Sequence, residues 1–215
     1  MDGTITPYEI MPMMAALFLR TDQIEELEVL LQQSVSGKIN WADSFVRRME
    51  MFGDIPVSQI DNFLKDLELY PNLHKFILDN KEHCAVVTGS FGPYIEQLTH
   101  KIGCPVFSSQ GIIKNDRVEK LTYVMNKIDV VNEFKKNGYR VVFVGDGAND
   151  VGAMTVSNLS IAAGMTHPPA LGCIEVADYV AHKEMDVIAI LNMELANSKA
   201  AMIKNIITQT KKEKA

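Results

Sequence analysis

The sequence has few cysteines and no long apolar run, and both absences narrow the classes of protein that it can encode. Its three cysteines are an odd number at wide spacings, so neither a disulfide framework nor a CxxC metal site is indicated. No stretch of about 18 apolar residues predicts a membrane span, and no basic segment followed by an apolar one marks a signal peptide. We therefore expect a cytoplasmic protein without a membrane partner.

Positive charge is scarce as well. The chain carries 21 Lys and Arg against 27 Asp and Glu, which gives a net charge of −6, and most of its basic residues are scattered. Binding to the phosphate backbone of nucleic acid needs a clustered positive field, so we expect no nucleic-acid partner. The composition gives no indication of the oligomeric state.

The sequence does contain two kinds of hydrophobic pattern. Over residues 8–69 the apolar residues recur at intervals of three and four, as in Ile24 and Leu27, and this spacing predicts helices. After Pro71 short apolar runs alternate with helical stretches, and a helix-prone segment begins at residue 186. The apolar runs cover residues 84–89, 104–109, 139–145, 159–163 and 178–181.

Runs of Val, Ile and Phe that are separated by helices are typical of a parallel sheet covered on both faces. We therefore predict an α/β fold for the part of the chain that follows Pro71. In an open parallel sheet, ligands bind beyond the carboxyl ends of the strands. The residues that directly follow each apolar run are thus the first candidates for function.

Two stretches that follow apolar runs offer metal-binding and phosphate-binding groups. GDGAND at residues 145–150 places two carboxylates four residues apart, with glycines that let the backbone approach a ligand. Mg²⁺ prefers such hard oxygen ligands. VTGSF at residues 87–91 adds hydroxyls and an exposed backbone N–H, a set that suits phosphate. The residues concerned are Asp146, Asn149 and Asp150 in the first stretch, and Thr88, Gly89 and Ser90 in the second.

One lysine is placed to complete this site. Lys127 lies between the two stretches and opens the helix KIDVVNEF, from which its ammonium reaches a phosphate as a point charge. Taken alone, a lysine that opens a helix is more typical of a solvated surface, and a threonine at a strand end usually serves a turn. The paired aspartates of GDGAND are hard to explain as turn residues, so we interpret the set as a ligand site.

Four motifs of the sequence, taken together, resemble those of the haloacid dehalogenase superfamily in order and spacing. They are DGT at residues 2–4, VTGSF at residues 87–91, Lys127, and GDGAND at residues 145–150. The resemblance covers essentially the whole chain and implies a Rossmann-like parallel-sheet core with Mg²⁺ as cofactor. It assigns metal binding to Asp2, Asp146 and Asp150, phosphate and substrate binding to Thr88, Gly89, Ser90, Lys127 and Asn149, and catalysis to Asp2 and Lys127.

In that superfamily the first motif is Asp-x-Asp-Gly-Thr, whose first Asp attacks phosphorus and whose second acts as acid and base. The resemblance makes Asp2 the second of these, so the attacking Asp and its strand are expected before Met1. Asp2 itself does not fit the nucleophile, because an attacking carboxylate must be held at a strand end and Gly-Thr follows Asp2 directly. The chain is then either a fragment of an enzyme or a variant that has lost its nucleophile.

Two functions of different classes therefore stay open. The first is Mg²⁺-dependent hydrolysis of a small phosphomonoester through an aspartyl-phosphate. The second is a catalytically inactive protein that keeps the phosphate and metal pocket for binding or regulation. An apolar run ending in Asp upstream of Met1 favours the first, and a stop codon there favours the second.

Within the superfamily the chain resembles the phosphoserine phosphatase group, whose helical cap is inserted directly after the first motif. That resemblance assigns residues 6–69 to the cap and residues 1–5 and 70–215 to the core. It places Glu9 against a substrate amino group and Arg48, within GKINWADSFVRR, against a substrate carboxylate, which Arg binds with two parallel donors. The alternative is that both residues are ordinary charges on solvent-facing helices.

On this resemblance the leading substrate is O-phosphoserine, while two departures leave another small phosphorylated metabolite open. Thr88 and Ser90 stand where the group usually has Ser and Gly, and the stretch after residue 163 carries an unexpectedly long loop with two prolines. The histidines show no metal-ligand spacing. We expect surface or strand-edge roles for His74, His83, His100, His167 and His182.

Overall fold

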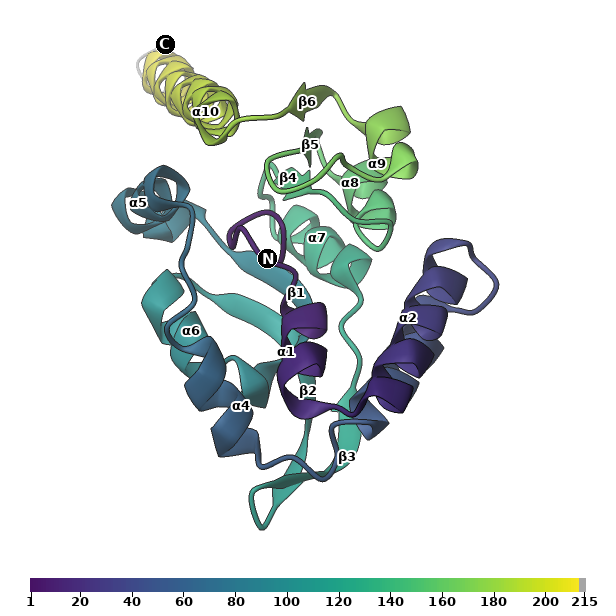
Figure 1. Cartoon of the computed structure of the whole chain (residues 1–215). Helices are drawn as coiled ribbons and strands as arrows, with labels where there is room; N and C mark the ends of the chain where they lie inside the picture. The colour runs from purple at the N-terminus through teal and green to yellow at the C-terminus, as the bar shows by residue number, and fades with distance from the viewer. Residues whose placement is uncertain (213–215) are drawn as a thin grey trace.

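The first part of the chain is helical, as the spacing of its apolar residues predicts. The structure is a computed structural model that describes residues 1–212, with side chains for residues 1–198. The division of the chain into a cap of residues 6–69 and a core stays a prediction. This part contains four helices, α1 (Ile10–Phe18), α2 (Thr21–Val35), α3 (Trp41–Glu50) and α4 (Val57–Leu64) (Figure 1).

Helix α3 shows how sequence and packing agree in this part. The Asn40 side chain caps its first turn by accepting a hydrogen bond from the backbone N–H of Ala42 at 2.8 Å. Phe45 and Met49, four residues apart, lie on one face and are buried. Arg48 lies on the same buried face, so the helix carries a cation toward the interior.

The first sheet contains one strand that the apolar runs did not predict. β1 (Val86–Phe91) pairs in parallel with β2 (Val106–Lys114), which pairs antiparallel with β3 (Arg117–Tyr123). β2 and β3 are joined by Asn115 and Asp116, whose φ angles of 51° and 60° fit a two-residue hairpin turn. Most side chains of β3 are exposed, and for this reason the strand has no continuous apolar run.

The second sheet is parallel throughout. β4 (Val142–Gly145), β5 (Leu159–Ala163) and β6 (Tyr179–Ala181) lie side by side in that order. All five positions of β5 are buried, as expected for a strand covered on both faces. The α/β class and the parallel-sheet core predicted from the sequence are confirmed.

Helices and short turns connect and flank the strands. The helix expected from residue 186 is confirmed as α10, and the last three residues of that segment lie outside the described part of the chain. None of the described helices has the length and apolarity to cross a membrane. The remaining elements are α5 (Pro71–Asp79), α6 (Glu96–Ile102), α7 (Lys127–Lys136), α8 (Val151–Val156), α9 (Leu171–Val176), α10 (Glu184–Lys212) and the 3-10 turns Lys81–His83 and Gly92–Tyr94.

Two hydrophobic clusters hold these elements together. The larger joins the four N-terminal helices to both sheets and includes the fully buried Phe52 and Leu98 together with Ile161 of β5. The smaller packs α7, α8 and α9 against the second sheet around Phe143 and Met154. The second sheet is therefore covered on both faces, and the larger cluster connects it to the first sheet.

The N-terminal turn lies between the two sheets. β1 and β4 are edge strands, and no strand among the described residues pairs with the free edge of either one. In Figure 1 the purple N-terminal turn lies between these two strands. The Ile5 carbonyl accepts a hydrogen bond from the Tyr70 N–H at 2.9 Å, and the Gly3 carbonyl accepts one from the Thr166 hydroxyl at 3.0 Å. The turn is thereby attached to the segments before α5 and after β5.

Candidate functional site

The N-terminal Asp-Gly-Thr turn is fixed to the end of β4. The Thr4 hydroxyl donates a buried hydrogen bond of 2.8 Å to Asp146 Oδ1. Gly3 has a φ of +64°, and a Cβ at this position would collide with Asp146 Oδ2. Only glycine therefore permits both the left-handed backbone and the close approach to the carboxylate. The first and last motifs of the sequence meet at this contact.

A buried ion pair lies beside that contact. Lys127 Nζ lies 2.6 Å from Asp150 Oδ1, and the two side chains are only 8% and 6% exposed. Asp150 Oδ2 accepts hydrogen bonds from the backbone N–H groups of Gly147 at 3.1 Å and Asp146 at 3.3 Å. Burial raises the pKa of Asp150, but the Lys127 ammonium, the N-terminal ammonium and the Gly147 N–H together outweigh this effect, so the net pKa is lowered and the carboxylate stays ionised. Both oxygens of Asp150 are thus engaged within the protein.

Asp2 offers the free carboxylate oxygen of the site. Its Oδ1 is buried and has no hydrogen-bond partner among the described residues. Burial raises the pKa of Asp2 from 3.8 to about 6, against the attraction of the N-terminal ammonium. A buried oxygen without a donor fits either a proton or a metal ion as its partner.

The stretch from Thr88 to Ser90 lies within β1, where the pairing of β1 with β2 is irregular, and lines the same cavity. The Thr88 hydroxyl is buried and accepts a hydrogen bond from the Ser90 N–H at 3.1 Å. A Cβ at Gly89 would meet the Trp41 ring at 2.5 Å and the Asn149 amide at 3.8 Å. Gly89 therefore lets the start of α3 and the GDGAND segment approach this part of β1 closely.

Arg48 enters the site from α3. Its side chain is 5% exposed, and its Nε donates to the Ser44 carbonyl at 3.2 Å. No acidic side chain of the described residues forms an ion pair with it, and burial alone lowers its pKa to about 10. The guanidinium lies 5.9 Å from the centre of the Phe45 ring, which stacks on Trp41. The alternative that Glu9 and Arg48 are both solvent-facing charges is therefore wrong for Arg48. Glu9 is exposed, as that alternative expected.

His167 is a residue of this site that the sequence interpretation missed. Its Nε2 lies 2.9 Å from Glu9 Oε1 and 3.1 Å from Asp146 Oδ2, and its Nδ1 lies 3.0 Å from the Pro168 carbonyl. The Pro168 carbonyl and the Glu9 carboxylate raise the pKa of the imidazole. The side chain is 38% exposed, so His167 lies at the surface as expected, and it also lines the cavity. His167 lies shortly after the apolar run of β5, and this position beyond a strand end is the sequence signal that could have identified it.

Two sets of residues are suited to a cation. Ligand atoms of Glu9, Asp146 and His167 lie within 4.8 Å of one another. Hydrogen bonds between the imidazole and the carboxylates account for this grouping without an ion. The set predicted from the sequence, Asp2, Asp146 and Asp150, shares only Asp146 with this grouping. In the predicted set Asp150 is paired with Lys127, whereas Asp2 keeps a free oxygen.

One cavity of about 370 Å³ brings all of these groups together. Every predicted site residue lines it, and so does Tyr94, whose buried hydroxyl has no partner among the described residues. The predicted residues in its wall are Asp2, Glu9, Arg48, Thr88, Gly89, Ser90, Lys127, Asp146, Asn149 and Asp150.

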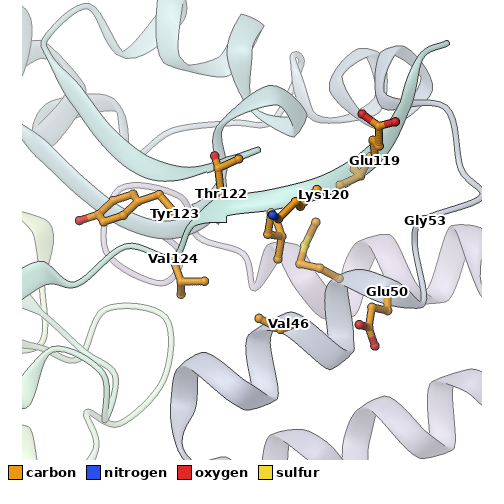
Figure 2. A pocket seen from close by; sticks show the side chains of 11 residues that line it. Val46, Glu50, Gly53, Glu119, Lys120, Thr122, Tyr123 and Val124 are labelled. Carbon is orange, nitrogen blue, oxygen red and sulfur yellow. The ribbon is translucent and has the colours of Figure 1, made fainter. Parts of the chain in front are cut away.

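A second groove, of about 400 Å³, lies between α3 and β3 and contains none of the predicted site residues. In Figure 2 the side chains of Val46 and Glu50 lie on the helix, and those of Glu119, Lys120 and Thr122 lie on the strand opposite. The predicted site residues therefore lie in the first cavity and not in this groove.

Comparison with known proteins agrees with this geometry. A family model described as haloacid dehalogenase-like hydrolase matches residues 1–155. Phosphoserine phosphatase SerB2 of Mycobacterium tuberculosis is 28% identical over 205 residues, which are 88% of this chain and 48% of that protein. Phosphoserine phosphatase of Methanocaldococcus jannaschii is 26% identical over 151 residues, or 64% of this chain and 72% of the relative. The chain thus spans about half the length of the mycobacterial relative.

Solved structures resemble the fold. A structure described as a substrate-bound phosphoserine phosphatase complex aligns with a TM-score of 0.69 at 24% sequence identity, covering 89% of this chain and 94% of the other. At this identity the alignment supports the α/β architecture and the order of its elements.

The Lys127–Asp150 pair makes a first testable prediction. Asp150→Asn keeps the volume but leaves the Lys127 ammonium buried without an anion, so we expect a loss of about 3 to 5 kcal/mol in the free energy of unfolding. Adding Lys127→Met to this variant should recover part of the loss. Urea denaturation measures both, with Lys136→Ala in the exposed pair with Glu133 as the matched control. If Asp150→Asn and the control variant are equally stable, the buried ion pair between Lys127 and Asp150 does not stabilise the fold and the prediction is wrong.

Asp2 makes a second prediction, on pH dependence. Because its pKa is raised in the folded state from 3.8 to about 6, the folded chain binds more protons than the unfolded chain in this window. The stability contributed by Asp2 is therefore present at lower pH and is lost as the pH rises from about 4 to 6, by at most about 3 kcal/mol. Asp2→Asn in metal-free buffer should lack this loss. Parallel pH profiles of unfolding for the two proteins would contradict it.

Proposed function

Because the chain belongs to the haloacid dehalogenase-like hydrolase family, we propose that it hydrolyses a small phosphomonoester that also carries a carboxylate, with O-phosphoserine as the leading substrate. The observation that carries this proposal is the buried Arg48 guanidinium, which has no anionic partner among the described residues and lines the same cavity as Lys127 and Thr88. A buried cation without an anion is costly, so its presence favours an anionic ligand. The phosphoserine phosphatases among the relatives support the substrate class.

The geometry suits phosphoryl transfer. The Lys127 ammonium, the Gly89 N–H and the Thr88 hydroxyl surround the space where the phosphoryl oxygens gain charge. As the attacking carboxylate of the proposed upstream strand forms its bond to phosphorus and the P–O bond of the ester breaks, Asp2 gives its proton to the leaving oxygen and an alcohol departs. Asp2 then takes a proton from the water that attacks the aspartyl-phosphate, which releases phosphate and the free carboxylate. Asp2 thus exchanges the proton in both steps, and the pKa of about 6 describes its carboxyl group in the metal-free site.

The attacking carboxylate, in this proposal, comes from a strand between β1 and β4. Both strands have a free edge, and the turn that carries Asp2 lies between them (Figure 1). A parallel strand that leads into this turn would satisfy the backbone groups of both edges. A carboxylate two positions before Asp2 would then lie at the strand end, beside Lys127.

Mg²⁺ fits the carboxylates that are present. Asp2 Oδ1 has no other partner, and Asp146 Oδ2 faces the same cavity. We propose that these two residues hold the ion, while Asp150 keeps Lys127 in place and contributes indirectly. When bound, the ion supplies positive charge for the phosphoryl oxygens. We further propose that the protein acts in the cytoplasm on a small phosphorylated metabolite.

A third prediction tests the proposed nucleophile. The 215-residue polypeptide should hydrolyse p-nitrophenyl phosphate or O-phosphoserine at no more than a trace rate, because loss of a nucleophile removes several powers of ten. Fusing a β-strand that ends in Asp-x to Met1 should restore activity, and the same fusion with Asn in place of Asp should not. Robust turnover by the 215-residue polypeptide would contradict the proposal, and a fusion that binds ligand without turnover would favour a binding or regulatory protein.

A fourth prediction tests the roles of Arg48 and Lys127. O-phosphoserine and O-phosphoethanolamine differ only by the carboxylate, so Arg48→Ala should weaken binding of the first and spare the second. The expected loss is about 2 to 4 kcal/mol, or roughly 30- to 1,000-fold in affinity. Lys127→Ala should weaken both. Calorimetric titration measures the affinities, with the exposed Arg47→Ala as control.

An equal effect of Arg48→Ala on both ligands would contradict a carboxylate site. Arg48 would then have a structural role, and the preference for phosphoserine would lose its main support. A failure of Lys127→Ala to weaken either ligand would contradict the phosphate site itself.

A further inference from the structure

Two cysteines that are distant in the sequence are brought together at the start of the first sheet. Cys84 precedes β1 and Cys104 precedes β2, and each lies two residues before a position that the register pairs, Val86 with Val106. The Val86 N–H donates to the Pro105 carbonyl at 2.9 Å, so the pairing of the two segments begins before the first residue of β2. Cys84 therefore lies opposite Cys104.

Both cysteine side chains lie on the same face of this sheet. Side chains alternate between the two faces of a sheet, so Cys84 shares the face of Val86, and Cys104 shares the face of Val106. Both cysteines and both valines pack against the larger hydrophobic cluster. Phe107, by contrast, packs against an aromatic ring of α7. The two thiols thus lie side by side on the face that is turned away from α7.

The spacing of the two cysteines suits a disulfide bond. Neighbouring strands lie about 4.8 Å apart, and the Cα atoms of a disulfide are usually about 4.4 to 6.8 Å apart. Burial raises the pKa of Cys84 to about 11, and the Cys104 thiolate adds to this effect, so the two sulfur atoms lie close enough to interact. Both cysteines are free and half-buried, whereas Cys173 is fully buried.

We propose that Cys84 and Cys104 form a disulfide bond when the folded chain meets a small disulfide oxidant such as oxidised glutathione. The thiolate of one cysteine attacks the small disulfide, a mixed disulfide forms, and one small thiol leaves. The thiolate of the other cysteine then attacks the protein sulfur of this mixed disulfide, so the bond between the cysteines forms and the second small thiol leaves. Two protons and two electrons pass from the cysteines to the oxidant.

This bond would fix the strand that carries two of the predicted phosphate-binding residues. It closes a loop of about 20 residues, from 84 to 104, which contains β1 with Thr88 and Gly89. Closing a loop restricts the unfolded chain, so the oxidised protein should be the more stable form. Neither cysteine is among the described residues that line the cavity, so the bond leaves the proposed ligand site open.

Burial also sets the rate at which the bond forms. It raises the pKa of both thiols, while the Val86 N–H favours the thiolate of Cys104. Only a thiolate attacks a disulfide, so the pair should react slowly at neutral pH. Below the pKa of the attacking thiol, the thiolate fraction and the rate should rise about tenfold for each unit of pH.

Oxidation of the 215-residue chain with oxidised glutathione, followed by mass spectrometry, tests the proposal. We expect an intact mass lower by two hydrogen atoms, a linked peptide pair that contains Cys84 and Cys104, and a Cys173 that stays reduced as the internal control. The rate should rise about tenfold from pH 7 to pH 8. The melting temperature of the oxidised chain should rise by on the order of 5 °C.

Two matched variants make the result specific. Cys84→Ser and Cys104→Ser each remove one partner, so neither variant should lose two hydrogen atoms or gain in melting temperature. Separate glutathione groups on Cys84 and Cys104, or a bond that includes Cys173, would overturn the inference. A bond that forms only in denaturant would overturn it too, because the folded register would then not bring the thiols together. An oxidised chain that melts below the reduced one would show that the bond distorts the sheet, and would equally count against the inference.

Discussion

The buried ion pair between Lys127 and Asp150 is the interaction on which the rest of the site depends. Lys127 opens α7 after the first sheet, and Asp150 follows β4 in the second, so the pair connects the ends of the two sheets. Two charges are tolerated at this depth because each has the other and because the second Asp150 oxygen binds backbone N–H groups. The result is a fixed ammonium in a region of low dielectric, where its attraction for a phosphate is stronger than at the surface.

The other polar groups of the cavity are costly to the fold unless a ligand meets them. Arg48 is buried without an acidic partner among the described residues, and Asp2 has a buried oxygen without a donor. Apolar residues in these places would serve stability better, so the presence of these polar groups supports the proposed anionic ligand and metal ion. Glu9 differs from them, because its side chain is exposed and its Oε1 lies 2.9 Å from His167 Nε2.

Much of this arrangement could be predicted from the sequence, and the failures have identifiable causes. The apolar runs predicted β1, β2, β4, β5 and β6 because buried parallel strands are continuously hydrophobic, whereas β3 was missed because most of its side chains are exposed. The motif residues were placed in one cavity because strand ends converge. The burial of Arg48 and the contact of His167 with Glu9 depend on how α3 and the loop after β5 pack, and local sequence patterns do not encode this packing.

The central claim is that the ends of β1 and β4 form one site for a phosphate and a cation. A crystal structure of the chain with Mg²⁺ and inorganic phosphate tests it most directly. The account predicts a phosphate oxygen within hydrogen-bond distance of Lys127 Nζ and of the Gly89 N–H, and an ion bound to Asp146 and Asp2. Phosphate bound only in the groove between α3 and β3, or an ion bound away from Asp146, would contradict it.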